Sequence, residues 1–196
     1  MQKSYLFELI SLVSEVIGDE LPIIVGSQSF FAQTDDPPLS VKESEECDFL
    51  LFGGKAAERD TINREYGVFS EFATEKSFFA DALGLASVTL PTGWEDRLKP
   101  LYDPDGKIVA KCLDPYDLAA CKIAAGRPKD LKFLEAALTS ELLTVEEFLE
   151  RTLLVRSKLE NDALKDRFER FIDHLQSKHI HSRIADKIRQ FIKERF

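Results

Sequence analysis

Residues 21–27 have the sequence Leu-Pro-Ile-Ile-Val-Gly-Ser, and residues 48–52 have the sequence Asp-Phe-Leu-Leu-Phe. Each is a short apolar run, rich in β-branched or aromatic residues, which is typical of a buried strand. Gly26 ends the first run and Gly53-Gly54 follows the second, so both strands are bounded by turn-forming residues. Two such strands with helical segments around them predict a sheet that is covered by helices.

The flanking sequence extends this pattern in both directions. Periodic apolar residues predict a helix over residues 5–17 that ends at Gly18, and residues 65–85 indicate only mixed helix and loop. Further helices are predicted over residues 28–33, 55–64, 114–126 and 128–138, and further strands over 85–90 and 107–113, the last after a turn at 103–106. From residue 144 onward the pattern is helical, with a capping box at Thr144 and Glu147.

These elements predict an α+β fold, with a small mixed β-sheet flanked by helices and an all-helical C-terminal segment. The composition changes near Ser140, because strands and turns occur only before it. We therefore expect a domain over residues 1–140 and a helical segment over residues 141–196.

Charge and composition exclude several classes of protein. Residues 1–100 carry 8 Lys and Arg against 18 Asp and Glu, which argues against a broad nucleic-acid surface there and is compatible with a metal site. No apolar run is long enough to cross a bilayer, and residues 1–20 lack the features of a signal peptide, so we expect a cytoplasmic protein without membrane partners. The three cysteines form no CxxC pair, and we expect them to be reduced and at least half-buried.

The first candidate site element is Gly26-Ser27, between a predicted strand and a predicted helix. A helix N-terminus offers unpaired N–H groups to a phosphate; Gly26 would let the phosphate approach the backbone, and Ser27 could donate a hydrogen bond to it. A tight turn with a helix cap is the alternative interpretation.

The second candidate element is the pair Glu46 and Asp48 at the start of the second strand. Side chains two residues apart on a strand point to the same face, so two carboxylates would lie together there. Carboxylate oxygens with substrate phosphates are the ligands that Mg²⁺ needs. A solvated strand edge is the alternative.

The third candidate element spans two consecutive helices and contains Asp117, Lys122, Arg127, Lys129 and Asp130. The cations could bind nucleotide phosphates, with the two carboxylates in a supporting role. The same residues could instead form ion pairs that tie the two helices together.

Four segments in this order resemble a known family. They are Val-Gly-Ser-Gln-Ser (25–29), Ser-Glu-Glu-Cys-Asp-Phe-Leu (44–50), Leu-Pro-Thr-Gly-Trp-Glu-Asp-Arg-Leu (90–98), and Leu-Asp-Pro-Tyr-Asp-Leu-Ala-Ala-Cys-Lys-Ile-Ala-Ala-Gly-Arg-Pro-Lys-Asp (113–130). Together they resemble a bacterial family of nucleotidyltransferase-like proteins of unknown function, and more distantly the abortive-infection nucleotidyltransferase toxins. The resemblance covers about residues 23–138, and its last segment is the longest and most specific.

The resemblance implies a nucleotidyltransferase-type core and a Mg²⁺-dependent transfer of a nucleoside monophosphate from a nucleoside triphosphate. The acceptor would be a protein or an RNA, and the setting could be toxin–antitoxin or phage defence. The paired metal-binding carboxylates of the superfamily map on Glu46 and Asp48, and its Gly-Ser motif maps on Gly26 and Ser27. A member of the superfamily that has lost catalysis and only binds a nucleotide or a protein partner is the alternative.

Two departures from the family pattern bear on catalysis. Glu46 stands where many members have Asp, and the strand predicted over residues 85–90 lacks the third carboxylate that active enzymes carry. Asp81, Glu95 and Asp96 are nearby in the sequence, and the sequence does not choose among them.

The C-terminal segment carries an apolar stripe of Ile184, Ile188, Phe191, Ile192 and Phe196, flanked by basic residues. It could pack on the body of the protein, form a homodimer with a second copy, or present basic residues to an acceptor RNA. The three histidines, all in this region, are predicted to be ordinary surface residues, because His179 and His181 lack a helical metal-ligand spacing.

Overall fold

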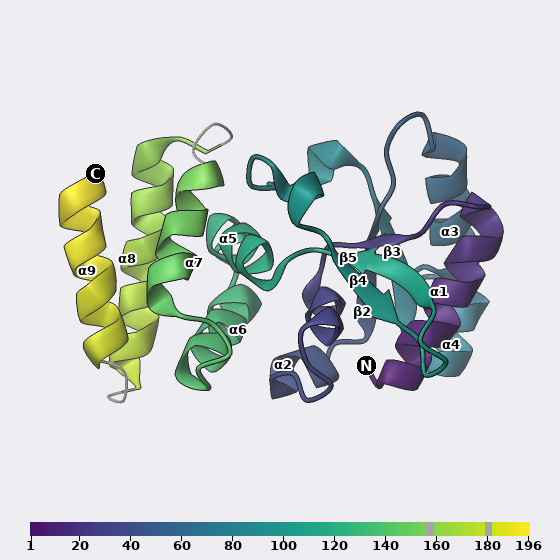
Figure 1. The fold of residues 1–196 in the computed structure, drawn as a ribbon, viewed down its shortest axis with the longest axis horizontal. Helices are drawn as coiled ribbons and strands as arrows, with labels where there is room; N and C mark the ends of the chain where they lie inside the picture. Colours follow the sequence, from purple (N-terminus) through teal and green to yellow (C-terminus); the bar gives the residue numbers. More distant parts are fainter. Residues whose placement is uncertain (156–158, 179–181) are drawn as a thin grey trace. The chain divides into compact units, whose positions relative to one another are not determined.

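The structure is a computed structural model that describes residues 1–155, 159–178 and 182–196. Two compact units make up the chain (Figure 1). The first contains residues 1–88 and 95–114, and the second contains residues 89–94 and 115–196. The predicted α+β class is confirmed, with a mixed sheet in the first unit and helices at the C-terminal end of the chain. The boundary predicted near Ser140 falls inside the second unit, because the two helices before it pack with the helices after it.

The first unit is built on a five-stranded sheet in the order β3-β2-β1-β5-β4. The strands are β1 (Ile23–Ile24), β2 (Glu46–Leu50), β3 (Phe79–Leu83), β4 (Lys99–Tyr102) and β5 (Ile108–Cys112). The pairs β1–β5 and β2–β3 are parallel, whereas β1–β2 and β4–β5 are antiparallel. The predicted mixed sheet is therefore present, although β1 is much shorter than the apolar run that predicted it.

One predicted strand is wrong. Residues 85–87 form a short 3-10 helix, η2 (Leu85–Ser87), and the strand lies just before it in β3. The sequence of β3 is Phe-Ala-Asp-Ala-Leu, which is poor in strand-forming residues. Pairing with β2 overrides that weak preference, since Ala80 and Ala82 are buried opposite Cys47 and Phe49.

One face of the sheet is a continuous core. Its residues alternate along the strands and are all almost fully buried: Ile24, Cys47, Phe49, Ala80, Ala82, Leu101, Ala110 and Cys112. Because side chains alternate along each strand, Glu46, Asp48 and Asp81 lie on the opposite face. All three are half-buried.

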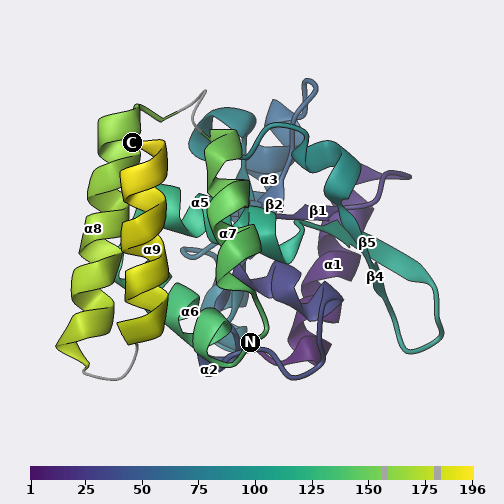
Figure 2. The same ribbon diagram turned by 60° about the vertical axis from the view of Figure 1, so that its left-hand side comes forward.

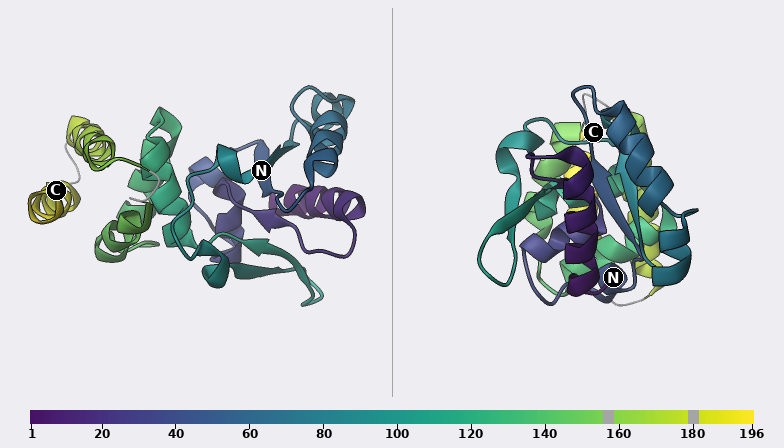
Figure 3. Two further views of the ribbon diagram at one scale, coloured as in Figure 1. Left: turned by 90° about the horizontal axis from the view of Figure 1, so that it is seen from above. Right: turned by 90° about the vertical axis from the view of Figure 1, so that its right-hand side faces the viewer.

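Helices of the first unit complete this core. They are α1 (Lys3–Ile17), the 3-10 helix η1 (Ser27–Ala32), α2 (Leu39–Lys42), α3 (Ala56–Tyr66) and α4 (Glu71–Lys76), and the 3-10 helix η3 (Trp94–Arg97) follows in the chain. The predicted first helix is confirmed: Leu6, Leu9, Ile10 and Val13 are its buried stripe, and it ends at Gly18, whose φ of 78° is accessible to glycine. Figure 3 shows α1 running past the β4–β5 hairpin, and α1 also contacts α3.

The second unit is helical. It contains α5 (Pro115–Ala125), α6 (Pro128–Thr139), α7 (Val145–Thr152), the 3-10 helix η4 (Leu153–Val155), α8 (Asn161–Ser177) and α9 (Ser182–Arg195). The predicted N-cap is present, since the Thr144 hydroxyl accepts a hydrogen bond from the Glu147 N–H at 3.4 Å.

Aromatic rings form the centre of the second unit. Phe168 of α8 lies between Phe148 of α7 and Phe191 of α9, with ring centroids 6.2 and 5.9 Å away. Ile188 and Ile192 of the predicted apolar stripe are buried as well, so the stripe packs within this unit, where α9 lies along α8 (Figure 2). A homodimer through these helices stays a prediction.

The remaining predictions about side chains and membranes have mixed outcomes. Cys47 and Cys112 are buried free thiols and Cys121 is half-buried, as expected. The prediction of a surface histidine is wrong for His174, whose half-buried ring bonds Glu135 at 2.8 Å, and the other two histidines lie outside the described residues. In the described ranges, no helix is long and apolar enough to cross a membrane.

Candidate active site

The acidic residues of the first unit converge through the register of two strands. Glu46 and Asp48 share one face of β2, as predicted from their spacing. Asp81 of β3 is the direct parallel partner of Asp48. Because neighbouring strands lie about 4.8 Å apart, the backbones of Asp48 and Asp81 are adjacent and their side chains leave the sheet on the same face.

This register identifies the acid that the sequence did not choose. Asp81 lies on a core strand beside the pair, whereas Glu95 and Asp96 are exposed residues of η3. The signal that could have found Asp81 is the strict alternation of Phe79 to Leu83, whose small buried alanines concealed a strand.

Antiparallel pairing brings Gly26 and Ser27 to the same place. Ile24 pairs with Phe49, and the Val25 N–H donates to the Asp48 carbonyl at 3.0 Å. The chain that leaves β1 therefore runs past the beginning of β2, where Asp48 lies.

Gly26 is in direct contact with the Asp48 carboxylate. A Cβ atom built on Gly26 would lie 1.5 Å from Asp48 Oδ2, so no side chain fits at this position. The backbone of Gly26, with φ −92° and ψ −162°, is accessible to any residue, which means that the contact and not the conformation requires glycine. The space that we expected a phosphate to use is filled by the carboxylate of Asp48.

Ser27 begins η1, which is a 3-10 helix of six residues in place of the helix predicted over 28–33. Its side chain is half-buried, and Gln28 and Ser29 behind it are buried. A phosphate-binding role for Gly26 and Ser27 stays a prediction.

The donor set suits Mg²⁺ in kind, because Glu46, Asp48 and Asp81 supply only carboxylate oxygens from one face of the sheet. Their side chains are not yet gathered around one point: among the residues that the structure describes, no group of three His, Cys, Asp or Glu could hold a metal ion. Ligation would therefore require the carboxylates to rotate toward one another.

In the second unit, the predicted Asp117 belongs to an ion pair between helices. Asp117 is fully buried on α5, and one of its oxygens accepts from Arg151 of α7 at 2.8 Å. Arg151 also bonds Glu147 at 3.1 Å and lies over the Tyr116 ring. Arg151 is a partner that the sequence analysis missed, since it follows Asp117 by 34 residues.

Asp130 is the centre of a second group of charges. The Arg127 guanidinium donates to both of its oxygens, at 2.7 and 3.2 Å, and Lys122 Nζ lies 3.2 Å from it. Burial alone would raise the pKa of Asp130, but the hydrogen bond from Arg127 and the charge of Lys122 outweigh it and hold the pKa below its ordinary value. Lys129 is exposed.

These contacts match the ion-pair interpretation of the third candidate element. Lys122 of α5 and Arg127 before α6 both bind Asp130, so the group links the two helices. Whether the same cations also bind nucleotide phosphates stays a prediction.

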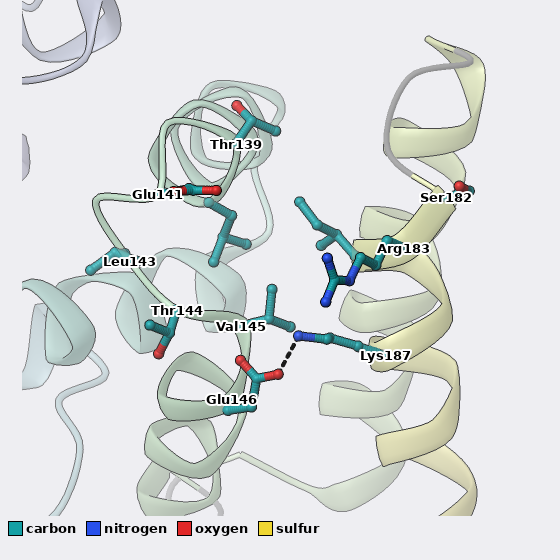
Figure 4. Close-up of a pocket in the computed structure, with 11 residues that line it drawn as sticks. Thr139, Glu141, Leu143, Thr144, Val145, Glu146, Ser182, Arg183 and Lys187 are labelled. Carbon is teal, nitrogen blue, oxygen red and sulfur yellow. Dashed lines mark hydrogen bonds and ion pairs between the residues drawn. The ribbon is translucent and has the colours of Figure 1, made fainter.

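A cavity of about 600 Å³ in the second unit lies between the α6–α7 turn and α9 (Figure 4). Its charged residues are Glu141, Glu146, Arg183 and Lys187, and Lys187 forms an ion pair with Glu146. Equal numbers of acids and cations do not make the strongly positive surface that binds phosphates. None of the nucleotide-binding residues predicted above lines this cavity.

Comparison with known proteins agrees with this arrangement. A family model described as a nucleotidyltransferase of unknown function (DUF6036) matches residues 4–180. The chain belongs to this family. The match confirms the family that the sequence motifs resemble, and it extends beyond them through α1 and α8. Searches of curated proteins and of solved structures gave no significant match.

Proposed function

We propose that this member of the nucleotidyltransferase family is a Mg²⁺-dependent enzyme that transfers a nucleoside monophosphate from a nucleoside triphosphate to an acceptor hydroxyl. The observation that carries the proposal is the register of Asp81 with Asp48, which adds a third carboxylate to the face that already holds Glu46. Membership of the family supports nucleotidyl transfer as the reaction class.

The three carboxylates have separate roles in this proposal. Glu46 and Asp48 would hold Mg²⁺, which neutralises charge on the triphosphate when it is bound. The acceptor oxygen forms a bond to the α-phosphorus, the bond from that phosphorus to the bridging oxygen breaks, and pyrophosphate leaves with the electron pair. Asp81 is assigned to the metal side of the acceptor hydroxyl, where a carboxylate can take its proton.

Asp48 is held for this task by two neighbours in the sheet. Its backbone carbonyl accepts from Val25, and its carboxylate lies against Gly26. A ligand that is fixed on a strand needs little reorganisation when substrate binds. The supporting role proposed for Lys122 and Arg127 is to place positive charge in the protein, and it rests on the resemblance alone, as do a protein or RNA acceptor and a toxin–antitoxin or phage-defence setting.

The second candidate function is nucleotide binding without catalysis. The observation that favours it is that the acidic side chains are not gathered as a metal site in the described part of the chain. The two functions differ in whether pyrophosphate is released.

Calorimetric titration of ATP, GTP, CTP and UTP in the presence of Mg²⁺ tests the proposal. We expect micromolar binding of at least one nucleotide to the wild type, and loss of binding in the Glu46→Ala/Asp48→Ala double variant. Asp60→Asn, which removes an exposed carboxylate from α3, is the matched control and should bind like the wild type.

Pyrophosphate release then separates the two functions. Release by the wild type that is lost in Asp81→Asn, while nucleotide binding is retained, would support catalysis. Binding without release, in the presence of protein and RNA from the source cell, would favour the second candidate. Absence of any nucleotide binding would refute both.

A further inference from the structure

Asp81 lies on the strand at the edge of the sheet, since β3 has β2 as its one neighbour in the strand order. The Phe79 N–H donates to the Glu45 carbonyl at 2.9 Å, and the Leu83 carbonyl accepts from the Leu51 N–H at 2.9 Å. Backbone groups alternate in direction along a strand, so residues 79, 81 and 83 face β2 while Ala82 faces the open edge.

The backbone of Ala82 is nevertheless paired. The Asn63 side chain on α3 accepts from the Ala82 N–H at 2.8 Å and donates to the Ala82 carbonyl at 3.0 Å. The amide thus occupies the place of a neighbouring strand at the residue that follows Asp81. Only a side chain with one donor and one acceptor in this arrangement makes both bonds, which restricts the position to an amide.

The position of Asn63 is itself fixed by the end of α3. A side chain on Gly67 would collide with the Asn63 carbonyl, so the chain turns tightly at this point. The Ser70 hydroxyl, which caps α4, donates to the Gly67 carbonyl at 2.7 Å. Asn63 itself is exposed and fills no space in the core, whereas its neighbour Ile62 is fully buried.

We propose that Asn63 is a positioning residue, which holds β3 in register so that the Asp81 carboxylate stays beside Asp48. The inference rests on the proposed function, because it assigns Asn63 a role toward that metal site. Without the amide, the Ala82 backbone would bond to water and the edge strand would be held at Asp81 by β2 alone. Groups that orient metal ligands change metal affinity by about 10- to 100-fold when they are removed, and we place this indirect effect at the lower end.

The test is Mn²⁺ titration of the full chain, followed by electron paramagnetic resonance of the free ion. We expect Asn63→Ala to raise the Kd for Mn²⁺ by roughly tenfold. Asn63→Asp keeps the acceptor for the Ala82 N–H and loses the donor to its carbonyl, so its Kd should lie between those of the wild type and Asn63→Ala. Hydrogen exchange of the Ala82 amide should become faster in Asn63→Ala.

Ile62→Val is the matched control, because it shortens a buried side chain of the same helix and leaves both bonds to Ala82 in place. We expect it to lower the melting temperature at least as much as Asn63→Ala and to leave the Kd for Mn²⁺ unchanged. An equal loss of Mn²⁺ affinity in Ile62→Val would overturn the inference, since the effect would then be one of stability.

The wild type and Asp81→Asn separate the two levels of the proposal. Mn²⁺ binding that depends on Asp81 but is the same in Asn63→Ala overturns the role of Asn63 alone. Mn²⁺ binding that Asp81→Asn leaves unchanged, or no binding to the wild type, refutes the proposed metal site and the role of Asn63 with it.

Discussion

Replacement of Gly26 by alanine tests the contact that joins the first strand to the acidic face. The added Cβ would lie 1.5 Å from Asp48 Oδ2 and 2.9 Å from Asp48 Cβ, whereas real Cβ atoms stay at least 3.0 Å from such neighbours. The carboxylate oxygen must therefore move by about 1.5 Å, which rotation of the Asp48 side chain can supply. The backbone can stay as it is, because its φ of −92° suits alanine.

A displacement of this size is large for a metal ligand and small for the fold. Metal–ligand distances in working sites hold to about 0.2 Å, and a misplacement of about 1 Å at a reacting centre can cost a hundredfold in rate. We expect Gly26→Ala to weaken Mn²⁺ and Mg²⁺–nucleotide binding by at least tenfold. The melting temperature should change by only a few degrees, since the opposite, buried face of the sheet is untouched.

The assay is Mn²⁺ titration beside thermal unfolding, with Gly84→Ala as the matched control. Gly84 follows β3 and has a negative φ, and an alanine there would meet only the flexible end of the Arg59 side chain. We expect Gly84→Ala to bind metal like the wild type. Wild-type affinity in Gly26→Ala would refute the reasoning, because it would mean that the position of the Asp48 carboxylate does not matter for binding. Equal losses in both variants would refute it as well.

Two further predictions concern the ion pairs of the second unit. Arg151→Met should lower the free energy of unfolding by about 3 kcal/mol, measured in urea, because it removes a cation from the fully buried Asp117; a loss below 1 kcal/mol would contradict this. Asp130 has a pKa below its ordinary value of 3.8 in the folded protein, so its ionised form adds stability above that pH, which is lost as the pH falls through the lower folded value. The urea midpoint of the wild type should therefore decline more steeply between about pH 5 and pH 2 than that of Asp130→Asn, and parallel declines would show that Asp130 does not contribute.

Local patterns in the sequence predicted the elements with strong periodicity. The helix over α1 and the strand at β2 have apolar spacing that matches only one kind of element, and Pro115 and Pro128 mark the starts of α5 and α6. β3 was missed because two of its five residues are alanine and one is aspartate, all of which are uncommon in strands. Pairing with β2 determines this strand, and the sequence carries no local sign of that pairing.

The candidate site divides in the same way. Glu46 and Asp48 could be paired from the sequence, because their spacing on a strand is a local property. The contact of Gly26 with Asp48 and the adjacency of Asp81 depend on which strands are neighbours and in which register, and these are long-range properties. The functional prediction therefore lacked its third carboxylate because a strand was missing.

The buried face of the sheet fixes the placement of the acidic face. A shift of β3 by one residue would move Ala80 and Ala82 out of the core and Asp81 into it, beneath the helices and against Phe49. An unpaired carboxylate in that position would cost several kcal/mol, which is comparable to the whole stability of a domain. The small alanines that made β3 hard to recognise are thus the residues that lock its register. The same pleat that buries them turns Asp81 toward the side of Asp48, so that the geometry proposed for the site follows from the packing of the core on the other face.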